Sequence, residues 1–213
     1  MMWAPFATCE TNSRAAVMPS GARFDLGTAP DPATIALGDI AMALATRKAM
    51  AVRHGLSYSV AQRAVMLADA LGREEPLWGC YGLMHFAPLA FGGWPDAQFV
   101  NAAGNGAMTA FATMWVRTAE AVHEAFDLDW PVPEAIAAPL MLAVDRLHLS
   151  ELISLGAGVD REIREYQLRG VRPLVRRIAP LAADKAYEKF FDGWWLYAAR
   201  AGLRESRTWR AVA

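Results

Sequence analysis

The stretch that decides the fold runs from Tyr58-Ser-Val-Ala-Gln-Arg63, through a helical run, to Leu83-Met-His-Phe-Ala-Pro-Leu-Ala-Phe-Gly-Gly-Trp94. Ser59 and Gln62 have the spacing of a capping box, in which each side chain satisfies one free amide at a helix start. Apolar residues then recur at helical spacing as far as Gly72, where we expect a left-handed cap. The pattern predicts a helix over residues 59–72.

Arg63 faces the apolar side of this helix, because it follows Val60 by three residues and precedes Leu67 by four. A guanidinium on that side needs a partner, since an unpaired charge away from water is costly. An ordinary solvated arginine is the less favoured alternative.

A second helix is predicted over residues 77–91, where the chain is apolar on nearly every side. Pro76 suits its first turn, and Gly92-Gly93 would close it. His85 is the only strongly polar side chain in this run. A lone histidine on a buried helix is more often a hydrogen-bonded core residue than a ligand.

Four motifs together resemble a known family: Phe24-Asp-Leu26, Asp39-Ile-Ala-Met-Ala-Leu44, Tyr58-Ser-Val-Ala-Gln62 and Leu83-Met-His85. Their order and spacing are similar to those of the 5′-deoxynucleotidase-like branch of the HD-domain phosphohydrolase superfamily. The resemblance covers most of the chain. It implies an all-α, single-domain HD-type helical bundle.

The resemblance also implies that most of the family's metal ligands are missing. The first metal histidine of the family falls on Arg63, its His-Asp pair on His85 and Phe86, and its last aspartate on Asp145. The catalytic glutamate falls on Leu89. An aspartate that usually follows in the family's motif falls on Trp94, which would line the cavity. The substrate-binding Arg-Phe of the family falls on Ala49-Met50. Three potentially cationic residues lie close by in the sequence, Arg47, Arg53 and His54.

These replacements predict a site without a metal cofactor. One histidine and one carboxylate are too few to hold a divalent ion and acidify its water. An arginine beside them is permanently charged, so it and a dication exclude one another. We expect the guanidinium of Arg63 to fill the metal position and pair with Asp145, with His85 alongside.

Composition fits one domain of 213 residues. The content of 54% hydrophobic residues, with 8 Trp and 10 Met, favours an apolar surface that is covered either by a second copy, as in a homodimer, or by a ligand. A net charge of −1 gives no basic field for nucleic acid. Cys9 and Cys80 form no disulfide framework, and neither a signal peptide nor a membrane span is visible, so we expect a cytoplasmic protein.

The chain is predicted to divide into an irregular N-terminal segment, residues 1–30, with a short extended piece at 22–26, and an HD-like helical domain, residues 31–213. Further helices are expected over residues 31–48, 108–126, 133–155 and 181–201. The small-residue run 101–106 lacks the lysine of a phosphate loop and is interpreted as a turn. The aromatic C-terminal helix is expected to serve core or dimer packing.

Two other pairs of side chains have the spacing of metal ligands. The spacing found in carboxylate-bridged metal bundles occurs in Glu120 with His123 and in His148 with Glu151. In the second pair the histidine comes before the glutamate, which is the reverse of the usual order, and the further carboxylates of such a site are missing. We therefore expect both to be surface pairs at helical spacing. Arg53 and His54 suggest an anion clamp over the cavity, with a solvated loop as the favoured alternative.

Three functions follow from these patterns. The first is a degenerate HD-phosphohydrolase-like protein, not an enzyme, that binds a nucleotide or other small anion in the old cavity. The second is a metal-independent enzyme with His85 as acid or base. The third is a dimeric structural or regulatory protein without a ligand, and an active HD-type hydrolase is the least favoured.

Overall fold

Two short antiparallel strands stand at the N-terminal side of a helical body. The computed structural model describes residues 15–25, 27–49, 58–92, 97–156, 160–205 and 207–209. Strand β1 (Ala15–Val17) pairs with β2 (Arg23–Asp25). Phe24 is buried, and its ring packs edge-on against Phe91 at 5.0 Å between centroids. The extended piece expected near residues 22–26 is therefore present, and it packs on the helices.

The first helix is shorter than predicted. Asp31 caps a 3-10 turn (η1, Pro32–Thr34) by accepting from the Ala33 amide at 3.0 Å, and helix α1 (Leu37–Thr46) follows. Asp39 of α1 is buried and holds the turn between the strands, because both carboxylate oxygens accept from Ser20, at 2.7 Å from its amide and 2.6 Å from its hydroxyl.

Helix α2 (Val60–Leu71) begins where the sequence predicts, but its caps differ from the expected ones. The Ser59 hydroxyl accepts from the Gln62 amide at 3.2 Å, whereas the Gln62 side chain does not return to the helix start. It binds the segment before helix α7 (Ala183–Ala201) instead, through the Ala179 carbonyl at 2.8 Å and the Leu181 amide at 2.9 Å. Gly72 is not left-handed, with φ −83°, and a Cβ there would lie 2.4 Å from the Tyr197 ring.

The predicted second helix is broken in two. Helix α3 (Pro76–Met84) ends at His85, and a 3-10 turn (η2, Ala87–Ala90) follows. Pro88 has no amide hydrogen to donate to the carbonyl four residues earlier, so the helix cannot continue through it. The break leaves His85 at the end of a helix, where its side chain borders a cavity.

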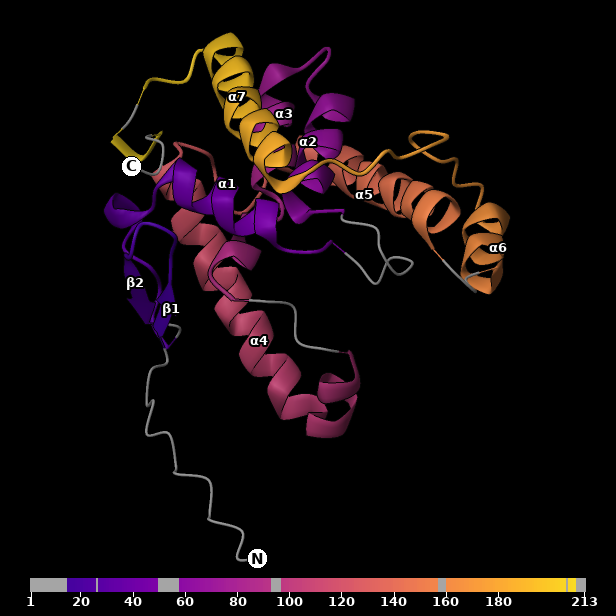
Figure 1. Cartoon of the computed structure of the whole chain (residues 1–213), viewed down its shortest axis with the longest axis horizontal. Coiled ribbons are helices and arrows are strands. Elements are labelled where there is room, and N and C mark those ends of the chain that lie inside the picture. The colour runs from indigo at the N-terminus through magenta and orange to yellow at the C-terminus, as the bar shows by residue number, and fades with distance from the viewer. Residues whose placement is uncertain are drawn as a thin grey trace, which may run out of the picture.

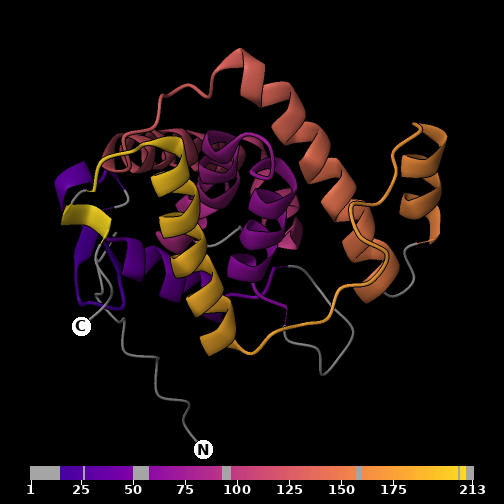
Figure 2. The same ribbon diagram turned by 90° about the horizontal axis from the view of Figure 1, so that it is seen from above.

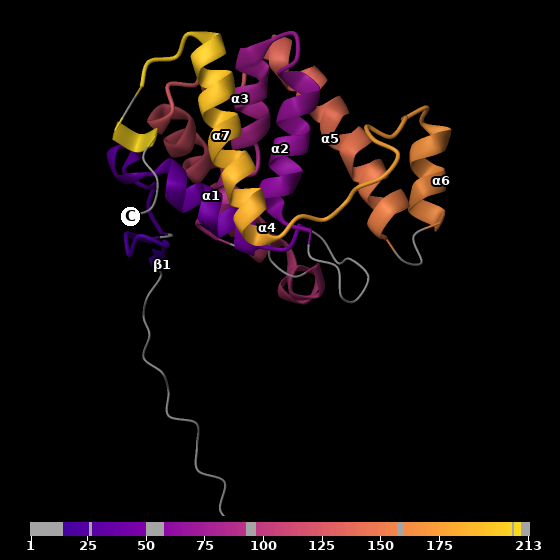
Figure 3. The same cartoon turned by 45° about the horizontal axis from the view of Figure 1, so that its top comes forward.

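Helices α2 and α3 cross at very short range. A Cβ on Gly82 would lie 2.8 Å from the Cα of Ala68, so only glycine permits this approach. Figure 3 shows α7 (Ala183–Ala201) beside both helices, which agrees with the contacts among the three. Its aromatic residues Phe190 and Trp194 are fully buried, as core packing predicts.

Two long helices extend from this core (Figure 1). Helix α4 (Ala97–Ala125) includes residues 101–106, so the turn predicted there is wrong. Helix α5 (Glu134–Leu155) ends at Gly156 as expected. Helix α6 (Asp160–Leu168) lies against the end of α5, away from the strands, as Figure 2 also shows, and a last 3-10 turn (η3, Arg207–Trp209) lies near α1.

The architecture is all-α apart from the two-stranded hairpin. The main core joins the hairpin to the helices through buried apolar side chains of α1, α2, α3, α4, α5 and α7. No helix in the described ranges has the length and apolarity to cross a membrane.

Candidate functional site

Arg63 enters the core from the first turn of α2. Its amide donates to the Ser59 carbonyl at 3.1 Å, so the side chain leaves the helix just after the cap. Only 13% of the side chain is exposed. The helical spacing therefore correctly predicts an inward arginine.

The partner of Arg63 is Glu151 of α5. The Nε of Arg63 lies 2.9 Å from Oε1 of Glu151, and the glutamate side chain is 0% exposed. The hydroxyl of Tyr58, itself fully buried, donates to the same oxygen at 2.9 Å. A buried carboxylate is stabilised by such neighbours, because a cation and a hydroxyl replace its lost hydration.

Two further groups complete this cluster. The Nδ1 of His148 lies 3.4 Å from Oε2 of Glu151, one turn earlier on α5. The guanidinium carbon of Arg63 lies 4.6 Å from the centre of the Phe86 ring, in cation–π distance. The cluster therefore ties α2, α5 and the end of α3 together through one ion pair.

Within this cluster, burial affects the protonation of Tyr58. Removal from water raises the pKa of Tyr58 far above its ordinary value, and the nearby Glu151 carboxylate raises it further. Tyr58 therefore remains a hydrogen-bond donor at every physiological pH. No proton transfer from this hydroxyl is available to chemistry near pH 7.

His85 lies next to this cluster, at the end of α3. Burial, the positive charge of Arg63 and the neighbouring His123 together lower its pKa to about 4, and burial is the largest of these causes. Its ring meets the Phe86 ring edge-on, with centroids 4.7 Å apart. Within the described part of the chain, neither ring nitrogen of His85 has a hydrogen-bond partner. The expected hydrogen-bonded core histidine is not what the structure shows.

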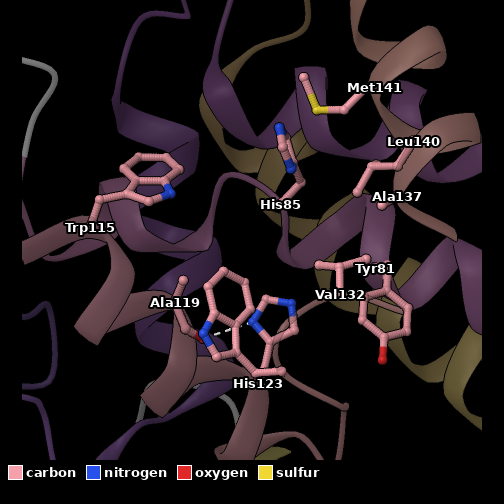
Figure 4. Close-up of a pocket in the computed structure, with 10 residues that line it drawn as sticks. Tyr81, His85, Trp115, Ala119, His123, Val132, Ala137, Leu140 and Met141 are labelled. Carbon is pink, nitrogen blue, oxygen red and sulfur yellow. Dashed lines mark hydrogen bonds between the residues drawn. The ribbon is translucent and has the colours of Figure 1, made fainter. Parts of the chain in front are cut away.

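A cavity of about 150 Å³ opens beside His85. Figure 4 shows the His85 ring between Trp115 on one side and Leu140 and Met141 on the other. Its walls come from α3, α4, α5 and the connection between the last two. The full described lining is Tyr81, His85, Trp115, Ala119, His123, Trp130, Val132, Ala137, Leu140 and Met141.

The sequence-predicted site residues are only partly brought together. Arg63 and His85 are close enough for the guanidinium to lower the histidine pKa. Asp145 has a different partner, because its Oδ2 binds Nη2 of Arg169 at 2.8 Å on a partly exposed surface. The predicted Arg63–Asp145 pair is therefore replaced by Arg63–Glu151. Arg53, His54 and Trp94 lie outside the described residues.

The residues at the family's ligand positions do not fit a divalent ion. Arg63 is a cation, Phe86 offers no donor atom, and the Asp145 carboxylate is paired with Arg169. No group of three or more metal-ligating side chains was found among the described residues. Divalent ions need several oxygen, nitrogen or thiolate ligands around one point.

Three important residues were missed or misjudged in the sequence. Glu151 and His123 were expected in surface pairs, yet both are buried. A signal for Glu151 was present, because it lies four residues after Leu147 and four before Leu155, on the apolar face of α5. Tyr58 precedes the helix, where periodicity carries no information about its direction.

Comparison with known proteins adds no family to these observations. No model of a protein family matches the chain, and no curated protein matches it. The resemblance to HD phosphohydrolases therefore remains a prediction from the quoted motifs.

Proposed function

We propose that this chain is a catalytically degenerate, HD-type helical protein that binds a small molecule beside His85 and does not hydrolyse phosphomonoesters. The observation that carries the proposal is the Arg63–Glu151 ion pair, 2.9 Å long, at the position where the family resemblance places a metal ligand. The ion pair takes over the structural role that a metal would have, because it joins α2 to α5.

The charge of Arg63 supports the loss of hydrolytic chemistry. A metal hydrolase needs a dication to polarise the phosphoryl group and to generate hydroxide. Arginine cannot be deprotonated in a protein, so a dication close to it is repelled. Tyr58 and His148 occupy further positions around Glu151, and its carboxylate is thereby committed to neighbours on both oxygens.

His85 alone is a poor catalyst for the metal-independent alternative. An effective general base has a pKa near the working pH, whereas burial and the neighbouring Arg63 and His123 lower the pKa of His85 to about 4. A catalytic histidine is also usually oriented by a second group, and the described residues supply no hydrogen bond to this ring. These observations favour a binding role for the cavity over acid–base catalysis.

The sequence predicts a nucleotide or other small anion as the ligand. Its expected clamp, Arg53 and His54, lies outside the described residues. A nucleotide would stabilise the folded protein if it bound, in proportion to the logarithm of its concentration over the dissociation constant. Thermal unfolding with and without deoxynucleoside monophosphates measures this directly.

The proposal is tested by metal content and by phosphate release. We expect elemental analysis of the purified protein to find less than one transition-metal ion per chain. Addition of Mn²⁺, Co²⁺ or Mg²⁺ should release no inorganic phosphate from deoxynucleoside monophosphates above the rate without protein. A stoichiometric metal, or metal-dependent release that survives repurification, would overturn the proposal.

The homodimer also remains a proposal, and it has a surface to test. Met108 and Val116 of α4, and Met141 and Leu142 of α5, are exposed by 45% to 55%. We propose that a second copy covers these exposed apolar side chains of α4 and α5. Sedimentation of the wild type and of a Val116→Glu, Leu142→Glu variant should show a dimer that the two charges weaken.

A further inference from the structure

We infer that the cavity beside His85 binds an uncharged, flat aromatic molecule of one or two rings that carries one hydrogen-bond donor. The inference rests on the proposed binding function and names the chemical class of its ligand. It follows from the size of the cavity, the character of its walls and the hydrogen bonding of His123.

The size of the cavity favours a small ligand. Its volume is about 150 Å³. An engineered apolar cavity of about this volume in another protein accepts benzene. A sugar phosphate joined to a base is much larger, so a complete nucleotide would need space beyond the described walls.

The walls favour an aromatic ring. Four aromatic side chains line the cavity, those of Tyr81, Trp115, Trp130 and His123. The His123 ring contacts two of the others, with its centre 4.8 Å from that of Trp130 and 5.7 Å from that of Tyr81. Aromatic rings attract one another in offset and edge-to-face arrangements. A flat ligand between such walls can adopt these arrangements, whereas a bulky aliphatic one cannot.

The walls also favour an uncharged ligand. No lysine, arginine, aspartate or glutamate is among the described lining residues. Burial lowers the pKa of both histidines, so both rings are neutral at pH 7. A carboxylate or phosphate here would lose its hydration without meeting a cation on these walls, which is strongly unfavourable.

His123 supplies a hydrogen-bond acceptor to the cavity. Its Nδ1 lies 2.7 Å from the Ala119 carbonyl, and a carbonyl oxygen can only accept, so Nδ1 carries the proton. In the neutral ring Nε2 then keeps its lone pair. Figure 4 shows this second nitrogen on the side of the ring away from Ala119, toward the space below His85. An N–H or O–H of the ligand is the matching group.

Among the described residues, the hydrogen bond of Nδ1 to Ala119 is the one that the His123 ring makes. The hydroxyl of Tyr81 donates to the Asp129 carbonyl at 3.2 Å and points away from the cavity in Figure 4. His85 borders the cavity without a hydrogen bond among the described residues. Met141, which is 53% exposed, forms one edge, and its flexible side chain suits an entrance.

The test compares two probes of nearly the same shape, indole and benzofuran, by calorimetric titration of the full chain at pH 7.5. Indole has the N–H donor and benzofuran has an oxygen in its place. We expect both to bind, and indole to bind about fivefold to tenfold more tightly, as one hydrogen bond of ordinary strength predicts. In a His123→Phe variant this preference should disappear.

Two variants locate the site. Ala137→Trp fills the cavity and should abolish binding of both probes, whereas Ala138→Trp places the same side chain on the exposed neighbouring position and should leave binding unchanged. Circular dichroism checks that each variant is folded. If Ala137→Trp fails to fold, the smaller Ala137→Leu, which should weaken binding at least severalfold, takes its place.

Each outcome bears on one of the two proposals. Absence of binding at millimolar indole, equal affinity for both probes, or binding insensitive to Ala137→Trp would overturn the inferred ligand class. Tighter binding of indole-3-carboxylate than of indole would overturn its neutrality. Metal content and phosphate release are measured on the same preparation, so failure of the hydrolysis-free function is seen separately from failure of the aromatic ligand.

Discussion

The Nε of Arg63 lies 2.9 Å from Oε1 of Glu151, and these two residues are 88 positions apart in the chain. The glutamate is completely removed from water, and Tyr58 donates to the same oxygen. Such an ion pair does not by itself make a protein more stable, because desolvation of both charges opposes their attraction. Its clearest consequence is that neither partner tolerates the loss of the other.

Single replacement of either partner should be severely destabilising. We expect Glu151→Met and Arg63→Met each to lower the free energy of unfolding by about 3–5 kcal/mol, because each leaves a charge without its counterion. The double variant should lose less than the sum of the two, with a coupling free energy of about 1–3 kcal/mol. Urea unfolding of the four proteins measures the cycle.

An exposed pair provides the matched control for this cycle. Arg161 and Glu165 of α6 are 3.0 Å apart, with side chains 89% and 58% exposed. The same replacements there should show a coupling of about 1 kcal/mol or less. If the core pair gave a coupling as small as the α6 pair, the proposed role of Arg63 in joining α2 to α5 would be wrong.

Tyr58→Phe isolates the hydroxyl that binds Glu151. A buried hydrogen bond to a charged group contributes about 1.5–3 kcal/mol, and we expect a loss of that size in the free energy of unfolding. Tyr197→Phe is the comparison, because its hydroxyl donates at 2.7 Å to Asp69 on an exposed position of α2, where water can replace it. A loss for Tyr58→Phe no larger than the loss for Tyr197→Phe would mean that burial does not strengthen the hydrogen bond from Tyr58 to Glu151.

The fold follows from the sequence where local chemistry and packing agree. Ser59 caps α2, and the apolar repeat of α5 continues to Gly156, so both helices were predicted close to their ends. The secondary-structure prediction failed where residues typical of turns lie inside a helix. The glycine and asparagine run 101–106 suggests a turn, yet it lies inside a helix of 29 residues, since propensity is a weak preference that context overrides.

For the candidate site, helical spacing predicts which side chains of a single helix face the core. Spacing gives the inward direction of Arg63, because its neighbours at three and four residues are apolar. Spacing does not give the partner of Arg63, which depends on the position of α5 relative to α2 along their axes. Asp145 and Glu151 lie six residues apart on α5, and about 9 Å separates two such positions along a helix axis. Only the assembled packing decides which carboxylate meets the guanidinium.

Gly82→Ala should test the close crossing of α2 and α3. A Cβ at Gly82 would lie 2.8 Å from the Cα of Ala68, so the helix backbones would have to separate, and we expect a loss of about 1–3 kcal/mol in the free energy of unfolding. Gly193→Ala is the same replacement in α7, with Leu83 Cδ1 at 3.7 Å, an ordinary contact. It should gain about 0.5–1 kcal/mol from the lower backbone entropy of alanine. Equal effects would contradict the crossing.

Stability should fall in acid because of His85. Burial and the charge of Arg63 lower its pKa from 6.5 to about 4 in the folded protein. Between these two pH values the histidine is protonated in the unfolded chain and neutral in the folded chain. The free energy of unfolding should therefore decrease as the pH falls. The slope for this one group approaches about 1.4 kcal/mol per pH unit. Above pH 6.5 and below pH 4 this contribution is constant.

Urea unfolding of the wild type and of His85→Gln from pH 8 to pH 4 measures the contribution of His85 as the difference between the two free energies of unfolding. His123 also has a lowered pKa, but it is present in both proteins. Parallel curves would mean that His85 is protonated as readily in the folded chain as in the unfolded one.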